Sequence, residues 1–207
     1  MKAVKVLSGG LVFLAGAALA VWFFMPWQQV GESALLFVSR RLPEPSSLSY
    51  SAVKSVPGGF SAENLSVSRL AGVTDVSCKT LTVVPDISAS LLNLAPTCRV
   101  AFTGGALDEI AVTPVKKLPG IDLGDGRAVV AAGRREIFLD GLRSNGELAM
   151  NGILLFDFSA MRIIRADVAL NVRSEPFENE VLPFLKNLLP LRQEAPGSWR
   201  LFREAVS

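Results

Sequence analysis

The stretch ADVALNVR, residues 166–173, decides the fold class. Val168, Leu170 and Val172 alternate with polar or small residues. Side chains of a β-strand point to opposite faces in turn, so a period of two predicts a strand with one buried face. The same alternation occurs in AENLSVSRL (62–70), KTLTVV (79–84) and RVAFTGG (99–105). The pattern therefore predicts a protein built mainly from β-strands.

Glycine-containing pairs lie at the ends of these alternating runs. They are Gly58-Gly59, Gly104-Gly105 and Asn145-Gly146. Asn-Gly is the strongest short signal for a hairpin, because both residues tolerate a positive φ. We expect the strand at 99–103 to stop at Gly104-Gly105. The predicted fold is a curved antiparallel β-sheet over residues 48–207, either a half-barrel or a sandwich, with one or two short helices.

Two segments predict short helices. ESALLFVSRRL (32–42) is expected to pack on the domain or to rest on lipid, and it ends at PEPSS (43–47) because proline cannot continue a helix. A second helix is predicted over 176–191, kinked or split by Pro183. Its apolar stripe has a spacing of three and four residues and consists of Phe177, Val181, Leu185, Leu188 and Leu189. This stripe is either a core helix covering the sheet or a helix that contacts a partner or lipid.

The N-terminus carries a long apolar run. Residues 6–27 contain no charged side chain, and a helix of that length spans about 30 Å, the thickness of a hydrocarbon core. Lys2 and Lys5 precede the run, so the positive-inside rule favours a cytoplasmic N-terminus. Trp22 and Trp27 lie near its far end, where such rings favour the membrane interface. We therefore predict a single-pass anchor that places the rest of the chain outside the cytoplasm.

A cleaved signal peptide is the main alternative to this anchor. Ala18–Ala20 has the small-x-small form of a cleavage site, but the apolar run is longer than the 7–15 residues of a signal peptide's apolar region. A buried helix in a soluble fold is a third reading. With the anchor, the chain divides into a cytoplasmic flank and transmembrane segment (1–27), a linker with a short helix (28–47) and a periplasmic β-rich domain (48–207).

The charge balance indicates the kind of partner. Lys2 and Lys5 are the charged side chains of residues 1–27, and the other 180 residues hold 19 basic and 19 acidic ones. A neutral domain lacks the basic surface that nucleic-acid binding needs. An anchor with a short basic flank and a sizeable exported domain fits a bacterial inner-membrane protein that faces the periplasm. The expected partners are the membrane, through residues 6–27, and other proteins or lipid, but not nucleic acid.

The residue types give little support for catalysis. The chain has no histidine, which removes the usual general base and the commonest metal ligand. GIDLGDGR (120–127) loosely resembles a calcium loop, but it lacks the ligand spacing and the terminal glutamate, so we interpret it as a turn. We predict no enzyme activity, no cofactor and no catalytic or metal-binding residue.

Cys78 and Cys98 are the two cysteines of the chain. The periplasm permits disulfides, and a bond closing a loop of about 20 residues would contribute roughly 3 kcal/mol. In a plain hairpin the two sulfur atoms would point to opposite faces, unless a bulge lies near Cys78 or the strands belong to different layers. We predict a structural disulfide, with two buried free thiols as the alternative.

The segment CKTLTVVPDISASLLNLAPTCRVAFTGGALDEIAV, residues 78–112, resembles a pattern of the type II secretion system protein N (GspN) family, within the broader AsmA-like group. In that pattern an alternating strand ends near a proline and leads into a Ser-Leu-Leu patch, and a second strand runs into Gly-Gly-x-Leu. The matching pieces here are 81–85, 90–92 and 104–107. Three further stretches are similar to the family's opening strand, later hairpins and final strand: 58–70, 145–172 and 196–202.

The resemblance implies a bitopic inner-membrane protein with a periplasmic β-rich domain. It would be a non-catalytic accessory component of the type II secretion machinery, and its partners would be other inner-membrane secretion subunits. The family carries no catalytic residues that could be transferred to this chain. The ending REAVS (203–207) lacks the glycine-leucine-proline close of the family, and the cysteine pair is not part of its pattern.

A periplasmic lipid carrier is the second functional hypothesis. A curved sheet with an apolar inner face can shelter acyl chains, as AsmA-like and LptC-like proteins are thought to do. A secretion subunit should fill that face with its own side chains. A carrier should leave an apolar groove of more than a few hundred Å² open.

Overall fold

The computed structural model describes residues 24–42, 44–70, 74–108, 110–111, 117–134, 136–157, 162–187 and 189–204, together with Gly16, Ala20 and Trp22. Within these residues the helical elements are α2 (Trp27–Ser39), α3 (Ile87–Asn93), a π-helical turn η1 (Phe177–Val181) and α4 (Leu182–Lys186). The strands are β1 (Ser47–Ser49), β2 (Ala52–Val56), β3 (Gly59–Leu70), β4 (Thr74–Pro85), β5 (Thr97–Leu107), β6 (Ile110–Ala111), β7 (Lys117–Leu118), β8 (Ile121–Ala132), β9 (Glu136–Ser144), β10 (Leu148–Asp157), β11 (Arg162–Val172), β12 (Leu191–Ala195) and β13 (Ser198–Arg203).

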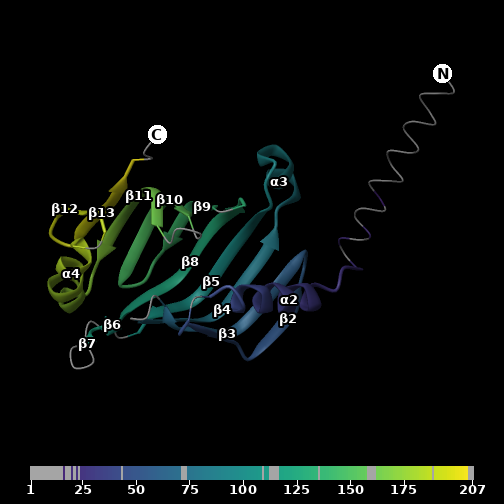
Figure 1. The fold of residues 1–207 in the computed structure, drawn as a ribbon, viewed down its shortest axis with the longest axis horizontal. Coiled ribbons are helices and arrows are strands. Elements are labelled where there is room, and N and C mark those ends of the chain that lie inside the picture. The colour runs from purple at the N-terminus through teal and green to yellow at the C-terminus, as the bar shows by residue number, and fades with distance from the viewer. Residues whose placement is uncertain are drawn as a thin grey trace, which may run out of the picture.

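One large antiparallel sheet dominates the described part of the chain. Its strand order is β1-β3-β4-β5-β8-β9-β10-β11-β13-β12, with β2 also paired to β3, while β6 and β7 form a separate small pair. Strands that follow one another along the chain are mostly neighbours, so the sheet is a meander. Figure 1 shows its strands curving together. The predicted mainly-β, antiparallel fold is confirmed, and a single curved sheet takes the place of the sandwich alternative.

A line of left-handed backbone positions crosses the sheet. Asn64 in β3, Gly104 in β5 and Gly124 in β8 have φ values of 50°, 55° and 64°. The register puts them at neighbouring positions, since Asn64 and Gly104 both lie opposite Lys79 and Gly124 pairs with the next residue of β5. Such positions kink a strand locally and increase its twist. They supply a bend without ending the strands.

The inner face of the sheet is defined here as the face on which α2, η1 and α4 pack. Residues directly opposite one another on paired strands share a face, so the register traces this face from strand to strand. One row of cross-strand neighbours on it consists of Pro85, Cys98, Val130, Leu139, Leu154 and Ala166. Along this row the inner face is therefore apolar from β4 to β11.

Helix α2 closes one end of the inner face. Its residues Trp27, Gly31 and Leu35, spaced by four, are buried. Trp27 and Leu35 form a core cluster with Val53, Phe60 and Ala62. A Cβ on Gly31 would lie 2.5 Å from the Phe60 ring, so glycine is what permits this close approach. Figure 1 shows α2 lying across β2 and β3.

A second core cluster lies at the other end of the sheet. Phe177, Val181 and Leu182, on η1 and the start of α4, are at most 1% exposed. They pack against apolar side chains of β8, β10, β11, β12 and β13, namely Ile121, Leu123, Leu148, Val172, Leu191 and Trp199. Pro183 lies in the first turn of α4, directly after the π-helical turn. The helical run is continuous through Pro183 and ends at Lys186, so the helix predicted over 176–191 is not split and is shorter than expected.

Several predicted boundaries are wrong. Helix α2 begins at Trp27, not at residue 32, and it packs on the sheet, so much of the predicted linker belongs to the fold. Strand β5 continues through Gly104 and Gly105 to Leu107, because glycine accommodates the bend there. The supposed turn at 120–127 is the first half of strand β8. By contrast, Asn145-Gly146 joins β9 to β10 as predicted.

The predicted anchor, residues 6–27, falls mostly outside the described residues. Among those that are described, no helix combines the length and the apolar character needed to cross a membrane. Trp27 does not present its ring to the surroundings as an interfacial residue would: it is 4% exposed and belongs to the core. Its indole Nε1 donates a hydrogen bond of 3.0 Å to the carbonyl oxygen of Trp22, and the two rings meet edge to face.

Candidate interaction surfaces

The connection between β4 and β5 contains the short helix α3, and hydrogen bonds to Asp86 hold it in place. We call this connection, residues 86–97, the α3 hairpin. The Asp86 carboxylate caps α3 by accepting hydrogen bonds from the Ala89 amide at 3.0 Å and the Ser88 hydroxyl at 2.7 Å. Its second oxygen accepts two bonds from the Arg99 guanidinium, at 2.8 and 2.9 Å. The Ala89 amide above all, with Ser88 and Arg99, holds the pKa of the Asp86 carboxyl well below its usual range.

Ser90 ties the same hairpin to the sheet. Its hydroxyl donates to the Asp86 carbonyl oxygen at 2.6 Å and accepts from the Thr97 amide at 2.8 Å. The Asp86 amide in turn donates to the Thr97 carbonyl oxygen at 2.8 Å. Thr97 itself is 3% exposed. These polar contacts fix the base of the hairpin on the strand ends.

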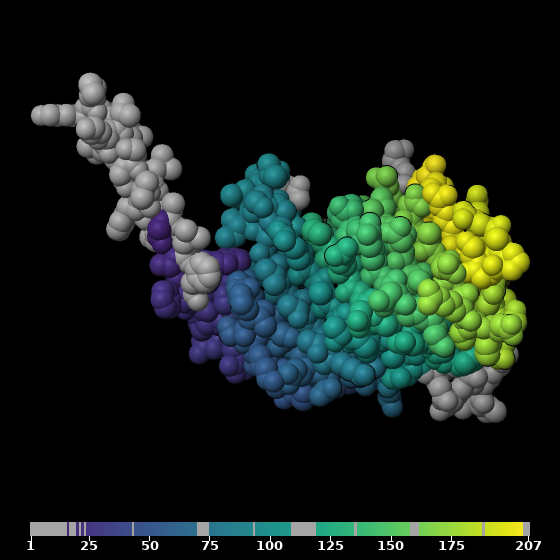
Figure 2. Space-filling model, turned by 180° about the vertical axis from the view of Figure 1, so that it is seen from behind, coloured from purple at the N-terminus to yellow at the C-terminus, as the bar shows by residue number. Residues whose placement is uncertain are grey.

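The tip of this hairpin is apolar and exposed. We define the α3 tip as Ile87, Leu91, Leu92 and Leu94, whose side chains are 53%, 72%, 85% and 93% exposed. Leu94 ends the helix in the left-handed region, with φ 50° and ψ 30°. Figure 2 shows the hairpin projecting from the body of the molecule. The sequence offers one signal that could have indicated this helix: Asp86, an N-cap residue type directly before the leucine-rich patch.

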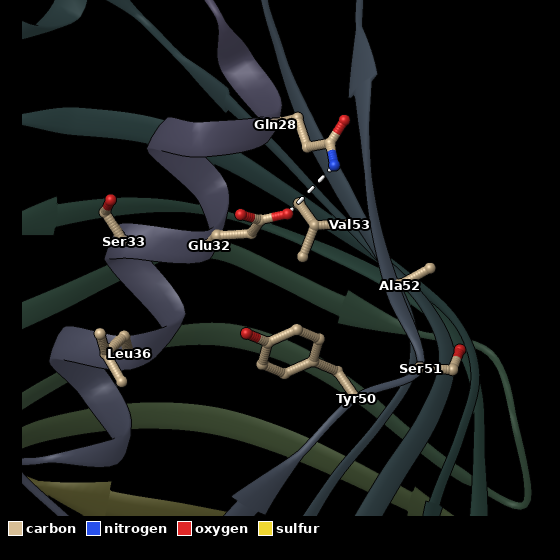
Figure 3. Close-up of a pocket in the computed structure, with 8 residues that line it drawn as sticks. All are labelled: Gln28, Glu32, Ser33, Leu36, Tyr50, Ser51, Ala52 and Val53. Carbon is tan, nitrogen blue, oxygen red and sulfur yellow. Dashed lines mark hydrogen bonds between the residues drawn. The ribbon is translucent and has the colours of Figure 1, made fainter.

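A hollow lies between α2 and the nearest strand edge. It has a volume of ≈530 Å³ and is lined by Gln28, Glu32, Ser33, Leu36, Tyr50, Ser51, Ala52 and Val53. Figure 3 shows side chains of α2 facing Tyr50 and β2 across it. Gln28 Nε2 donates a hydrogen bond of 3.1 Å to Glu32 Oε1 inside this space. Nothing in the sequence pattern pointed to this hollow, because it forms between segments that pack only in the tertiary fold.

The predicted contact stripe at 176–191 serves mainly the core. Phe177 and Val181 are buried, and Leu185 and Leu189 pack against the same cluster, while Leu188 lies outside the described residues. In this fold Phe177 and Val181 are not available to a partner or to lipid, because they fill the end of the inner face. The geometry agrees with the alternative of a core helix.

Glu178 fastens η1 to the last hairpin. Its Oε1 accepts hydrogen bonds from the Gly197 amide at 2.7 Å, from Gln193 Nε2 at 3.1 Å and from the Trp199 indole at 3.2 Å. The Gly197 amide, followed by the Trp199 indole, lowers the pKa of the Glu178 carboxyl. The sequence pattern does not reveal this residue, because its three donors lie 15 to 21 positions away.

The two cysteines do not meet in this structure. Both are free thiols, partly buried, and burial raises the pKa of each. The register pairs Cys98 with Pro85, seven residues beyond Cys78 on β4. Seven residues of strand span about 23 Å, whereas a disulfide needs Cα atoms within about 7 Å. The predicted staple is therefore wrong for this fold, and the alternative of two free thiols describes it.

Comparison with protein families identifies the chain. A model of the family described as "Type II secretion system protein GspN-like, Synergistales" matches residues 4–203. The chain belongs to this GspN-like family. The match spans the apolar N-terminal run, the curved sheet and both helical ends, so the resemblance stated from residues 78–112 is confirmed. No curated protein and no solved structure matches the chain.

Proposed function

We propose that this GspN-like protein is a non-catalytic accessory component of the type II secretion machinery in the inner membrane. The apolar run that begins at residue 6 would anchor it with the N-terminus in the cytoplasm. The curved sheet would stand in the periplasm and contact other inner-membrane secretion subunits. The family match over residues 4–203 carries this proposal, because it includes the anchor segment and the sheet together.

The hollow beside α2 supports a role in protein contact. It is open, it mixes polar and apolar side chains, and it lies against β2, a strand paired only to β3 among the described strands. Outer strands of a sheet offer unpaired backbone groups to a partner segment. A partner would meet Tyr50 and Leu36 there. The exposed Gln28 and Glu32 side chains, which hydrogen-bond to each other, could form hydrogen bonds with the partner instead.

Site-specific crosslinking in the host cell tests this function. A photoreactive residue replaces Tyr50 in the hollow, and a matched control replaces Thr103, which is exposed on the opposite face of the sheet. We expect crosslinks from position 50 to an inner-membrane subunit of the secretion machinery, and none from position 103. A second arm deletes the protein and measures release of a secreted enzyme. Unchanged release together with no specific crosslink would contradict the proposal.

A lipid carrier is the second candidate function, and one observation favours it. Between the two core clusters, Val130, Leu139 and Leu154 lie on the inner face and are only half-buried. Apolar side chains in that position can shelter an acyl chain. Native mass spectrometry of the full chain, extracted in mild detergent, with lipid analysis of the same sample, separates the two candidates. Near-stoichiometric bound lipid would favour the carrier, and a lipid-free protein would favour the secretion component.

A further inference from the structure

We propose that α3 is a second membrane contact of this protein. In this proposal the α3 tip inserts into the interfacial layer of a phospholipid bilayer, beside the point where the N-terminal segment enters that bilayer. The inference rests on the anchor in the proposed function. It adds an orientation: one edge of the sheet lies flat against the membrane and does not hang from a flexible linker.

The position of Trp22 limits the distance between the sheet and the bilayer. Trp22 packs on the turn between β2 and β3, where a Cβ on Gly58 would lie 2.9 Å from its indole nitrogen. It also belongs to the core cluster beside α2. The apolar run that remains before it, residues 6–21, would span about 24 Å as a helix. A hydrocarbon core is about 30 Å thick, so the Gly58 turn must lie at the bilayer surface.

The α3 hairpin rises from the same edge of the sheet. Phe60 pairs with Val83, so the Gly58 turn lies beside the end of β4. A Cβ on Gly59 would collide with the Val83 carbonyl oxygen, which shows how close the two segments are. Strand β4 ends at Pro85 and α3 begins two residues later. Both views of the molecule place α3 and the start of α2 at the same end of the sheet (Figures 1 and 2).

The chemistry of the hairpin suits a lipid surface. Residues 87–98 contain no charged side chain. Their exposed members are three leucines, an isoleucine, Ser88 and Pro96. Apolar side chains of this kind settle roughly 5–10 Å into the boundary between headgroups and acyl chains. The Asp86–Arg99 ion pair stands at the base of the hairpin, where headgroups and water can solvate it. Phe24, 87% exposed and two residues after Trp22, adds apolar surface near the entry point.

The backbone conformation of Leu94 independently supports a contact between the α3 tip and lipid. A left-handed residue after a helix is usually glycine, because a Cβ is unfavourable in that conformation. Here a leucine takes the position although its side chain is 93% exposed and contributes nothing to the core. This position therefore holds a residue that is unfavourable for the backbone conformation and whose side chain faces outward. Contact with lipid would make that side chain useful.

The test is fluorescence of the full chain in phospholipid vesicles. In a Cys78→Ala/Cys98→Ala background, a single cysteine carries an environment-sensitive NBD label at one of three positions. Leu92→Cys reports on the α3 tip, and Glu147→Cys reports on the opposite edge, at the exposed turn between β9 and β10. Val12→Cys reports on the anchor. Lipids with a nitroxide near the headgroup or in mid-chain act as quenchers.

We expect a blue-shifted emission at position 92 that headgroup-proximal nitroxides quench, and a water-like, weakly quenched emission at position 147. Adding Leu91→Asn and Leu94→Asn to the Leu92→Cys chain should remove the quenching at position 92. A blue shift at 92 without lipid quenching would mean that protein covers the tip, which would overturn the proposal. A buried label at 12 with a water-like label at 92 would overturn it and leave the anchor intact. Water-like emission at both 12 and 92 would contradict the anchor of the proposed function as well as the contact at the α3 tip.

Discussion

Single residues decide how the α3 hairpin behaves, and Leu94 is the clearest case. Its left-handed backbone is unfavourable for any side chain with a Cβ. We expect Leu94→Gly to raise the free energy of unfolding by about 1 kcal/mol, because glycine occupies this conformation without the penalty. Leu94→Ala keeps the Cβ and removes the exposed leucine, so it should leave stability unchanged. Urea unfolding of the full chain in detergent measures both.

The two Leu94 variants also separate stability from membrane contact. Both should weaken lipid quenching at the α3 tip, since both remove the leucine side chain, but only the glycine variant should gain stability. Equal stability of the glycine and alanine variants would show that the left-handed conformation carries no penalty at this position.

The contribution of Glu178 to stability should depend on pH. Its pKa is lowered from the ordinary value of 4.5, because the charged carboxylate accepts three hydrogen bonds. A group with a depressed folded-state pKa stabilises the fold above its unfolded-state pKa. It loses that contribution as the pH falls through the folded-state pKa. Relative to Glu178→Gln, the wild-type chain should therefore be more stable at neutral pH, and the difference should shrink below pH about 4.5.

Thermal unfolding at a series of pH values measures this difference. Asp86 and Asp167 also have lowered pKa values, so the wild-type profile alone cannot be assigned to Glu178. The glutamine variant keeps both aspartates and isolates one carboxyl. A constant difference from pH 7 to pH 3 would contradict the role given to the charge of Glu178.

At the scale of elements, the packing of α2 on the sheet depends on Gly31. Alanine is the better helix former by about 1 kcal/mol, but its Cβ at this position would lie 2.5 Å from the Phe60 ring and 2.8 Å from Val53. Phe60 is buried and has little room to move. We therefore expect Gly31→Ala to destabilise the protein by about 1–3 kcal/mol through overpacking.

The matched control is Ser33→Ala, on the exposed side of the same helix. There the change from serine to alanine should be neutral or slightly stabilising, since no side chain of the sheet is crowded. Denaturant unfolding of the two variants compares them directly. Equal stability of the two would mean that α2 does not pack as closely as the Gly31–Phe60 contact requires.

The elements also show what sequence reasoning could reach. Alternation identified β11 and the strands around 62–105, because one face of each is buried and the other is not. It missed α3, since a seven-residue helix with exposed leucines has no stripe directed at a core. It misplaced Trp27 because the burial of that residue depends on Val53 and Phe60, which lie far along the chain. The strand end expected at Gly104 failed because the line of left-handed positions becomes visible only when β3, β5 and β8 are aligned.

At the scale of the whole molecule, the described residues form two cores joined by a long sheet. The cluster beside α2 and the cluster around η1 and α4 share no residue. Between them, inner-face residues such as Val130 and Leu139 are half-buried. Cooperativity between the two ends therefore depends on the strand pairing across β5, β8 and β9. The α2 end would carry the membrane contacts proposed above, and the far end would then be the part that can open without releasing the membrane.

Leu182→Ala tests this division of the molecule. Leu182 is 1% exposed in the far cluster, and truncation of such a leucine costs about 2–5 kcal/mol. We expect faster hydrogen exchange in β11, β13 and η1 of this variant, with little change in β2 and β3, because the loss acts on a cluster that α2 does not touch. Exchange of the full chain in detergent, read by mass spectrometry, resolves these segments. A uniform acceleration over both ends would show instead that the continuous backbone hydrogen bonding of the sheet makes the domain a single cooperative unit, and that the half-buried middle transmits the loss from one core to the other.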